Sequence, residues 1–452
     1  MKRSLWIAPL ALSLLGLYFL PLYGAKWLII KKAEKKTASH ITIDTCRLSW
    51  LGPQSFEKVR FNGLELDGTI GRLETKVPLW RLSEIKDEFS LTQGHFTLRS
   101  ASFKETQIEQ VEASLHQGLF SISGQTQEGN LPGSFSIQGT AKKIPTDFSV
   151  EGALSSFPTA LIDRLLGAEG LLIETLGSSF DVKGTAQSEK GVGTTDLVLS
   201  SPQCQTQIQA RFDRRFIYLR KPLFADLKLT PSISAALMRE INPLFITGIR
   251  AKNPIRIEID AEGFAFPYHP FEISHLIIGR ASLDMGRIRV ANGPTLQSLI
   301  ALLQANPLKH LREMDAWFTP LTFAIENGVV HTQRLDLLLD NSIHICTWGD
   351  VDLVQDKLRM YLGLPADTLA YAFGLKGLNP DYVKKIPIRG TTGQPDLQSG
   401  PAAAEIATLV AAQKLPIPGK AGRIIGNIAN AITQLKNDPD VPPAKRPFPW
   451  ER

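Results

Sequence analysis

Residues 323–364 decide the fold class: FAIENGVVHTQRLDLLLDNSIHICTWGDVDLVQDKLRMYLGL. Asn327-Gly328 has the composition of a two-residue hairpin turn. After it, apolar residues recur at every second position of short runs that polar turns separate. This period predicts consecutive antiparallel strands with one apolar and one wet face. The apolar face carries Leu335, Leu337, Leu339, Ile343, Ile345, Val351, Leu353, Leu358, Met360 and Leu362.

Similar alternation in residues 255–260 and 286–292 extends the prediction to most of the chain. We predict a mainly β protein built on a long, twisted antiparallel sheet. Helical periods predict insertions near 157–167, 231–245 and 293–318, and C-terminal helices within 401–437, where 421–437 is amphipathic. Residues 438–452 are rich in proline and predict an unstructured tail.

A short phrase made of an apolar residue, a polar residue, glycine and a small residue recurs along the chain. It stands in residues 122–126, 135–144, 150–154, 182–186 and 388–392. The intervals are too irregular for a solenoid of fixed period. We interpret the glycines as bends at the ends of successive strands of a meander. Glycines that merely end unrelated strands are an equally good interpretation.

The composition and the lack of known motifs argue against enzyme activity and against nucleic-acid binding. The net charge of +6 is small for 452 residues, and the body shows no basic stripe with interleaved aromatics. The three cysteines lie far apart, and neither metal-ligand spacing nor a hydrolase or nucleotide-binding motif occurs. We therefore expect no enzyme activity, cofactor or metal. The polar positions of 334–359 are those of a wet strand face: Arg334, Asp336, Asp340, His344, Asp350, Asp352 and Arg359.

The N-terminus predicts a membrane anchor. Residues 5–25 carry no charge, and at about 1.5 Å per residue they span roughly 30 Å, the thickness of a hydrocarbon core. A cleaved signal peptide is the alternative, but the apolar run is longer than is usual for one. Residues 1–36 are therefore expected to form an anchor with a basic flank. Five lysines follow the segment and two basic residues precede it, so the charge count favours a cytoplasmic body.

Several stretches together resemble the AsmA-like and TamB-like family of bacterial envelope proteins. They are the anchor with ITIDTCRLSWLGPQSFEKVRFNGLEL, GRLETKVPLWRL, FSVEGALSSFPTALIDRLLG with SFDVKGTAQ, residues 320–365, and KKIPIRGTTGQPDLQ. The resemblance implies an inner-membrane, single-pass anchor and a periplasmic β domain over residues 37–400. It further implies that the sheet folds into an elongated U-shaped groove that holds phospholipid acyl chains. Long domains translocate largely regardless of nearby charge, so we place this body in the periplasm.

Two functions follow as expectations. In the first, the ten apolar residues between 335 and 362 line a groove for phospholipid, and the protein helps lipid transfer or envelope maintenance. In the second, the same residues form a filled core, and the protein is a non-enzymatic scaffold or assembly factor for envelope or outer-membrane proteins. Expected partners are membrane lipids, the inner membrane through residues 5–25, and an outer-membrane or periplasmic protein at the distal end.

Overall fold

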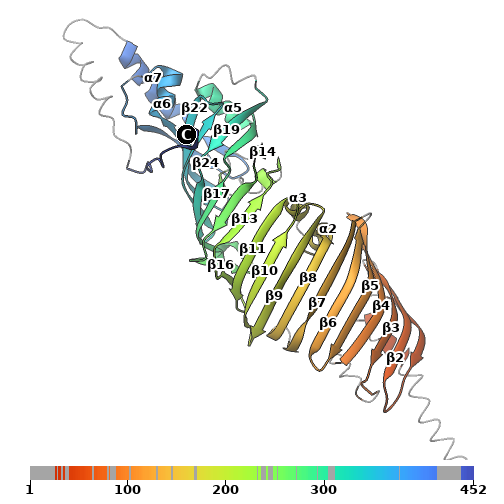
Figure 1. The fold of residues 1–452 in the computed structure, drawn as a ribbon. Coiled ribbons are helices and arrows are strands. Elements are labelled where there is room, and N and C mark those ends of the chain that lie inside the picture. Colours follow the sequence, from red (N-terminus) through yellow and green to blue (C-terminus); the bar gives the residue numbers. More distant parts are fainter. Residues whose placement is uncertain are drawn as a thin grey trace, which may run out of the picture. The chain divides into compact units, whose positions relative to one another are not determined.

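The computed structural model describes residues 40–451 with gaps, and a few residues between 26 and 35. The gaps are 64–65, 79–80, 82–87, 101–102, 129–130, 144–145, 167–169, 236–240, 243–247, 304–310, 415–438 and the single positions 232, 252, 271, 293 and 376. The chain divides into two compact units, residues 1–201 and 202–452. The boundary between them lies inside residues 37–400, which the sequence predicted as one β domain. Both units are mainly β and antiparallel, as predicted (Figure 1).

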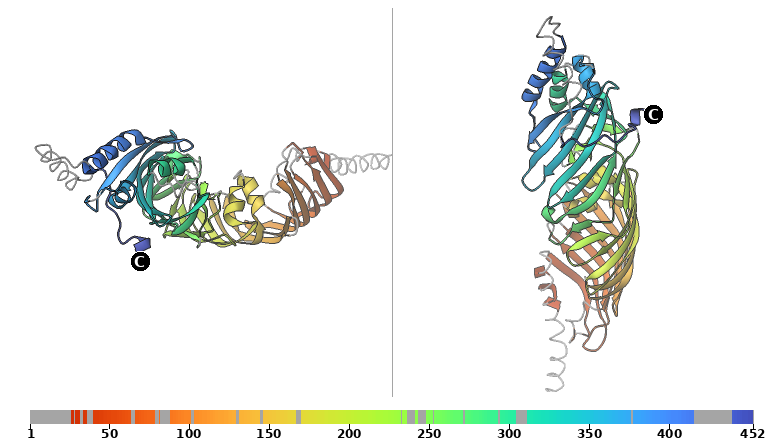
Figure 2. Two further views of the ribbon diagram at one scale, coloured as in Figure 1. Left: turned by 90° about the horizontal axis from the view of Figure 1, so that it is seen from above. Right: turned by 90° about the vertical axis from the view of Figure 1, so that its left-hand side faces the viewer.

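Unit 1 is a meander in which each strand pairs with the next one along the chain. Its strands are β1 (His40–Arg47), β2 (Gln54–Asn62), β3 (Leu66–Thr75), β4 (Glu88–Ser100), β5 (Phe103–His116), β6 (Leu119–Glu128), β7 (Leu131–Lys143), β8 (Asp147–Pro158), β9 (Ser179–Glu189) and β10 (Val192–Ser200). Helices α2 (Thr159–Leu166) and α3 (Leu171–Leu176) connect β8 to β9, and α2 lies in the expected insertion at 157–167. Figure 2 shows both helices on one side of the sheet.

The glycines of the recurring phrase lie inside strands of unit 1, which differs from the expected strand-end bends. Gly124, Gly139, Gly152 and Gly184 are internal residues of β6, β7, β8 and β9. A Cβ at Gly124 would come within 2.6 Å of the Phe135 ring, so glycine lets a bulky neighbour lie across the adjacent strand. Only the last copy fits the original interpretation, because Gly390 ends its strand with φ of 93°.

Unit 2 consists of the strands that follow β10. The earlier ones are β11 (Cys204–Phe212), β12 (Phe216–Leu219), β13 (Leu223–Leu227), β14 (Gly248–Ala251), β15 (Ile255–Ile259), β16 (Phe264–Pro267), β17 (Ile277–Asp284), β18 (Arg287–Ala291), β19 (Glu313–Phe318) and β20 (Leu321–Glu326). The later strands are β21 (Val329–Leu339), β22 (Ile343–Asp352), β23 (Lys357–Pro365), β24 (Val383–Gly390) and β25 (Pro395–Leu397). Strands β20 to β25 pair consecutively, and β21 also pairs with β19.

The predicted hairpin at Asn327-Gly328 is present in unit 2. Both residues have positive φ, 52° and 73°, and they join β20 to β21 with Glu326 opposite Val329. This is the backbone that a type I′ turn requires, and asparagine followed by glycine adopts it at least cost. The apolar runs predicted after this turn form β21, β22 and β23, which pair antiparallel as expected, but the break expected at residues 348–350 lies inside β22.

Three helices of unit 2 fall in or near expected ranges. Helix α5 (Pro294–Leu302) opens the range 293–318, but residues 313–318 of that range form β19, in which Met314, Ala316 and Phe318 alternate as buried residues. Only part of 231–245 is described, and its described residues 233–235 and 241 are helical. Helix α6 (Ala366–Phe373) was not predicted, and α7 (Ser399–Lys414) starts the expected C-terminal helices. The predicted helix at 421–437 lies outside the described residues.

The last described segment, residues 439–451, packs against the rest of unit 2, although the sequence predicted an unstructured tail. It contains no strand and only a short 3-10 helix, Pro449–Glu451, which agrees with its proline content. Its aromatic residue Phe448 is nevertheless 2% exposed. Proline restricts the segment to an extended path but does not prevent aromatic side chains from packing, so composition alone gave the wrong expectation.

The expected anchor, residues 5–25, lies outside the described residues. Among the helices that are described, none has both the length and the apolar composition to cross a bilayer. Just after the expected anchor, the ammonium group of Lys26 donates to the carbonyl of Ile43 in β1 at 2.9 Å.

If these glycines are needed where a neighbouring strand approaches closely, alanine substitutions at two paired positions of unit 1 should have different effects on stability. A Cβ at Gly184 would lie 2.2 Å from the carbonyl oxygen of Asp196, whereas one at Gly152, its partner across the strands, would meet nothing closer than 3.4 Å. We expect Gly184→Ala to destabilise unit 1 by about 1–3 kcal/mol through overpacking. Gly152→Ala is the matched control and should be neutral or slightly stabilising. Thermal unfolding of the full chain followed by circular dichroism measures both; equal effects would contradict the interpretation.

Candidate functional site

One uninterrupted row of apolar or small residues crosses every strand of unit 1. Register pairing links neighbours in the row directly, from β1 to β10. At about 4.8 Å per strand, the row is on the order of 40 Å long. We call it the apolar row, and its members are Cys46, Phe56, Leu73, Leu91, Ala113, Ile122, Ile137, Gly152, Gly184 and Leu197.

Two parallel rows flank the apolar row on strands β6 to β10. One contains Phe120, Gly139, Val150, Ala186 and Thr195, and the other contains Gly124, Phe135, Leu154, Val182 and Leu199. The opposite face of the same strands carries mostly polar residues, among them Ser136, Gln138, Ser149, Glu151, Lys183, Thr185 and Gln187, which are exposed. The three rows therefore form a continuous apolar face, which we call the apolar face of unit 1.

Most of the apolar face is only half-buried. In the apolar row Ile122 is 37% exposed, and Ile137, Gly152, Gly184 and Leu197 are of intermediate exposure. Backbone groups here are satisfied by strand pairing, and the residues that the structure describes place no covering layer over these side chains. Such a surface has apolar area left to bury, which a filled core does not.

Each end of the apolar face is covered by a different segment of unit 1. At the β1 end, Ile29 and Ile30 pack on the cluster of Ile41, Phe56 and Val59. At the other end, β9 contacts α2 and α3, and Phe157 and Phe180 are 7% and 5% exposed. The Phe157 ring contacts that of Phe180, 6.1 Å between centroids, and that of Phe135, 6.3 Å. The half-buried area lies between these ends.

A buried carboxylate of α2 binds the start of α3. Asp163 is fully buried and accepts hydrogen bonds from the backbone N–H groups of Gly170 at 2.7 Å and Leu172 at 2.9 Å. It thereby satisfies donors at the start of α3 that the helix itself leaves unpaired. The two helices are fixed as one cover over β9.

The groove wall predicted from the sequence is instead a filled core of unit 2. Strand pairing brings its residues together as expected, with Leu337 opposite Ile345 and Val351 opposite Leu358. However, each of them except Leu353 is 2% exposed or less, and Leu353 is half-buried. Those nine buried residues offer no surface to a ligand.

A buried polar pair shows what fills part of that interior. The amide nitrogen of Asn242 donates to the hydroxyl of Thr347 at 2.7 Å, and both residues are fully buried. Thr347 lies on the face of the predicted wall, between its register partners Leu335 and Leu362. The chain segment at 241–242 therefore covers this face with the protein's own side chains.

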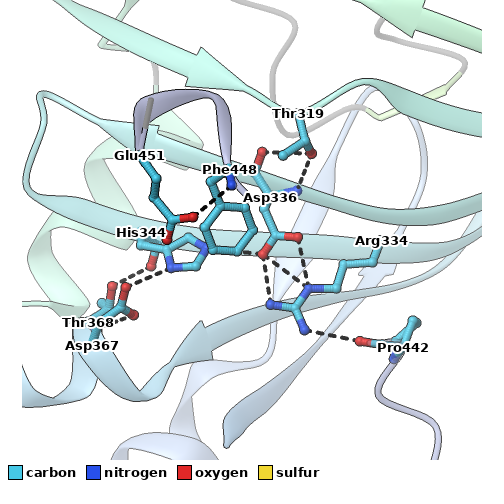
Figure 3. A network of polar contacts seen from close by, with 9 residues as sticks. All are labelled: Thr319, Arg334, Asp336, His344, Asp367, Thr368, Pro442, Phe448 and Glu451. Carbon is cyan, nitrogen blue, oxygen red and sulfur yellow. Dashed lines mark hydrogen bonds and ion pairs between the residues drawn. The ribbon is translucent and has the colours of Figure 1, made fainter. Parts of the chain in front are cut away.

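The face predicted to be wet is partly buried in unit 2. Arg334, Asp336 and His344 are 7%, 1% and 4% exposed. Arg334 binds Asp336 with Nη2 at 2.7 Å and Nε at 3.0 Å, while His344 places Nε2 3.0 Å from Asp336 and Nδ1 2.8 Å from Asp367 of α6 (Figure 3). Thr368 donates to the carbonyl of His344. The alternation of polar and apolar residues correctly predicted that these three side chains share one face of the sheet. It could not show that residues 439–451 cover that face.

The electrostatics of this cluster favour charged groups despite burial. Burial alone would lower the pKa of His344, but its hydrogen bonds to Asp336 and Asp367 outweigh burial and raise that pKa above the ordinary value. Burial would raise the pKa of Asp367, but the hydrogen bond from His344 holds it below the ordinary value. Burial also raises the pKa of the Cys346 thiol, so this cysteine stays protonated and unreactive.

A cleft of about 770 Å³ adjoins this cluster. Its walls come from α6, from the loop at 375–381 and from residues 441–446, and Arg334, His344 and Asp367 reach it. Among the described residues, no group of three or more histidine, cysteine, aspartate or glutamate side chains could hold a metal ion. The contacts that the cluster does show are ion pairs among Arg334, Asp336, His344 and Asp367.

The sequence analysis missed two features of this structure, the apolar face of unit 1 and the covering segment 439–451, and each left a signal in the sequence. The apolar face of unit 1 was marked by the glycine phrase itself, because FSIQGTA, FSVEGAL and FDVKGTA alternate with period 2. The covering segment was marked by Phe448 and Trp450 inside a stretch otherwise typical of a solvated tail.

Truncation of one side chain in each place separates core from open face. Leu337→Ala removes a fully buried side chain and should destabilise unit 2 by about 2–5 kcal/mol. Ile122→Ala, at a site 37% exposed, should cost about 1 kcal/mol or less, because little buried volume is lost. Urea unfolding of the full chain gives both values. A large loss for Ile122→Ala would mean that the apolar face of unit 1 is packed core.

Comparison with protein-family models, with curated proteins and with solved structures found no match to this chain. The resemblance to AsmA-like and TamB-like proteins therefore stays a prediction that rests on the sequence pattern.

Proposed function

We propose that the protein is a membrane-anchored, non-enzymatic lipid-binding protein that holds phospholipid acyl chains along the apolar face of unit 1. The observation that carries the proposal is the apolar row, which no charged or strongly polar side chain interrupts across the whole unit. The proposed binding surface therefore lies on β1–β10. It does not lie on the wall predicted within residues 335–362, because those side chains are largely buried.

The physical chemistry of a hydrocarbon chain fits this surface. An acyl chain offers no hydrogen bonds, so its binding wall must be apolar over a backbone that is already paired. Each CH₂ group that leaves water contributes roughly 0.8 kcal/mol, so contact with a few neighbouring strands can hold a chain. Because no fixed polar group marks one position along the apolar row, a bound chain could shift from strand to strand.

The proposal includes the expected U-shaped groove as the site of the bound lipid and the expected anchor as the attachment to the membrane. The side of the sheet that carries α2 and α3 is concave (Figure 2), and these helices contact β9 near one end of the apolar face. Residues 29–30 cover its other end, close to where the predicted anchor stops. We place the body in the periplasm and the anchor in the inner membrane, so that lipid would enter from the anchored end. Lipid transfer or envelope maintenance would be the role.

Paired substitutions on the two faces of β7 test the proposal. Ile137→Asp puts a charge in the middle of the apolar row, whereas Gln138→Asp adds the same charge to the polar face one residue away. The full chain and both variants are purified in a mild detergent, and retained phospholipid is quantified by mass spectrometry. Ile137→Asp should retain about tenfold less lipid, the factor that about 1.4 kcal/mol of lost affinity produces. Gln138→Asp should match the unmodified chain.

The control also excludes lipid that merely surrounds the N-terminal segment, because both variants keep that segment. Circular dichroism of each variant verifies that the sheet is intact. Equal lipid in all three proteins, or none in the unmodified chain, would contradict the proposal and favour a scaffold whose apolar face binds protein.

A further inference from the structure

The connection between β1 and β2 presents the most exposed large apolar side chain among the residues that the structure describes. This connection, which we call the β1–β2 loop, comprises residues 48–53 with the sequence LSWLGP, and its Leu51 is 88% exposed. Trp50 stands next to Leu51 and is half-buried. Single apolar residues are common on protein surfaces, so exposure alone assigns no role to Leu51. The construction of the loop and its place in unit 1 are more informative.

The side chain of Gln54 holds the β1–β2 loop in one shape. Gln54 is fully buried, and its amide oxygen accepts from the backbone N–H of Ser49 at 2.7 Å. Its amide nitrogen donates to the carbonyls of Ser49 at 2.7 Å and of Gly52 at 2.8 Å. The hydroxyl of Ser49 accepts from the N–H of Gly52 at 2.9 Å. Leu51 is therefore presented on a braced backbone, and binding a partner through it costs little ordering of the loop.

The segment that follows the expected anchor lies along one edge of β1. Its described residues between 26 and 35 are helical. The carboxylate of Glu34 accepts from the N–H of Ile41 at 2.9 Å, and the ammonium group of Lys26 donates to the carbonyl of Ile43 at 2.9 Å. Ile41 and Ile43 are alternate residues of one strand, so both backbone groups point to the same edge. The segment therefore runs opposite to β1, with Lys26 nearer the end from which the β1–β2 loop extends.

Other contacts of this segment reach the residues just before the loop. Burial raises the pKa of the Cys46 thiol and the positive charge of Lys26 opposes that rise, which places the ammonium group near Cys46. Ile29, Ile30 and Leu48, the first residue of the loop, pack on the same apolar cluster of β1 and β2. The expected anchor therefore meets unit 1 at the end that carries the β1–β2 loop.

Exposed tryptophan and basic side chains stand at this end of unit 1. Trp27 is 59% exposed, and the ammonium group of Lys31 lies 4.6 Å from the centroid of its ring. Arg47 precedes the loop directly and is exposed. Lys76 is also exposed, and the carbonyl of the residue after it accepts from Gln54 at 3.3 Å. Tryptophan is enriched where hydrocarbon meets headgroups, and basic side chains are attracted to anionic headgroups, so this composition suits a bilayer surface.

We propose that the β1–β2 loop is a membrane-contact site, whose Leu51 and Trp50 enter the headgroup region of the bilayer while Arg47 and Lys76 face anionic headgroups. The inference rests on the anchor of the proposed function and adds a second attachment to it. Leucine and tryptophan are the residues with which interfacial segments enter this region. Because Cys46, the first member of the apolar row, stands two residues before the loop, the contact would hold the start of the row at the bilayer surface.

Fluorescence quenching in vesicles tests the contact in the full chain. A fluorescent amino acid is placed at position 51 or, as the control, at position 192, where Val192 of β10 is 60% exposed on the polar face of unit 1. Each chain is reconstituted into vesicles of equal parts phosphatidylcholine and phosphatidylglycerol that carry a lipid-bound quencher at headgroup depth. Quenching should be several-fold stronger at position 51 than at position 192. Equal quenching at the two positions would overturn the proposal.

A second probe position assigns the contact to Leu51. With the fluorescent amino acid at position 53, Leu51→Glu should remove most of the quenching, because a carboxylate resists transfer out of water. Val354→Glu changes a side chain of unit 2 that is 57% exposed, and it should leave the quenching unchanged. Both substitutions alter exposed side chains, so neither should unfold the chain, which circular dichroism verifies. Undiminished quenching in Leu51→Glu would show that this residue does not meet the bilayer.

Flotation of the same vesicles on a density gradient separates this inference from the proposed function. A chain that floats with the vesicles but is not quenched at position 51 keeps its anchor and loses only the loop contact. A chain that does not float contradicts the anchor and the loop contact together. Retention of phospholipid by the apolar face is measured independently, through Ile137→Asp.

Discussion

Antiparallel pairing in register assigns every side chain of unit 1 to one of two faces, and the rest of the account depends on this constraint. Because residues alternate along each strand, a shift of one residue in any pair would bring polar side chains into the apolar row. The observed register avoids this at every step from Cys46 to Leu197. The glycines belong to the same constraint, since they make room for Phe135 and Leu197 to lie across neighbouring strands.

The same alternating sequence pattern forms a covered apolar face in unit 2 and a half-buried apolar face in unit 1. In unit 2 the apolar face of β21–β23 is closed by the chain itself, as the buried Asn242–Thr347 hydrogen bond shows, and the face expected to be wet lies under residues 439–451. In the described part of unit 1, helices α2 and α3 and residues 29–30 cover the ends of the apolar face and leave its middle half-buried. A stable sheet with both faces buried and a half-buried sheet with apolar area to spare therefore occur in the same chain.

The sequence predicted well where the strands lie, but it predicted poorly which faces of the strands are covered by other parts of the chain. The reason is physical. Period 2 fixes which residues share a face, so Leu335, Leu337 and Leu339 were grouped correctly, and Asn327-Gly328 located a turn. Whether a face is then covered depends on contacts far away in sequence, such as Asn242 with Thr347, 105 residues apart. Local composition carries no information on such pairs. The same limit explains why a proline-rich terminus was expected to be solvated although Phe448 is buried.

Photo-crosslinking from the middle of the apolar row tests the central claim most directly. A photoreactive amino acid at position 137 of the full chain, activated in cells, records by mass spectrometry what lies against the apolar face of unit 1. The account predicts adducts with phospholipid at position 137 and none at position 138 on the opposite face. Crosslinks from position 137 to this chain's own peptides, with no lipid adduct, would show that the face is filled by protein and would contradict the account.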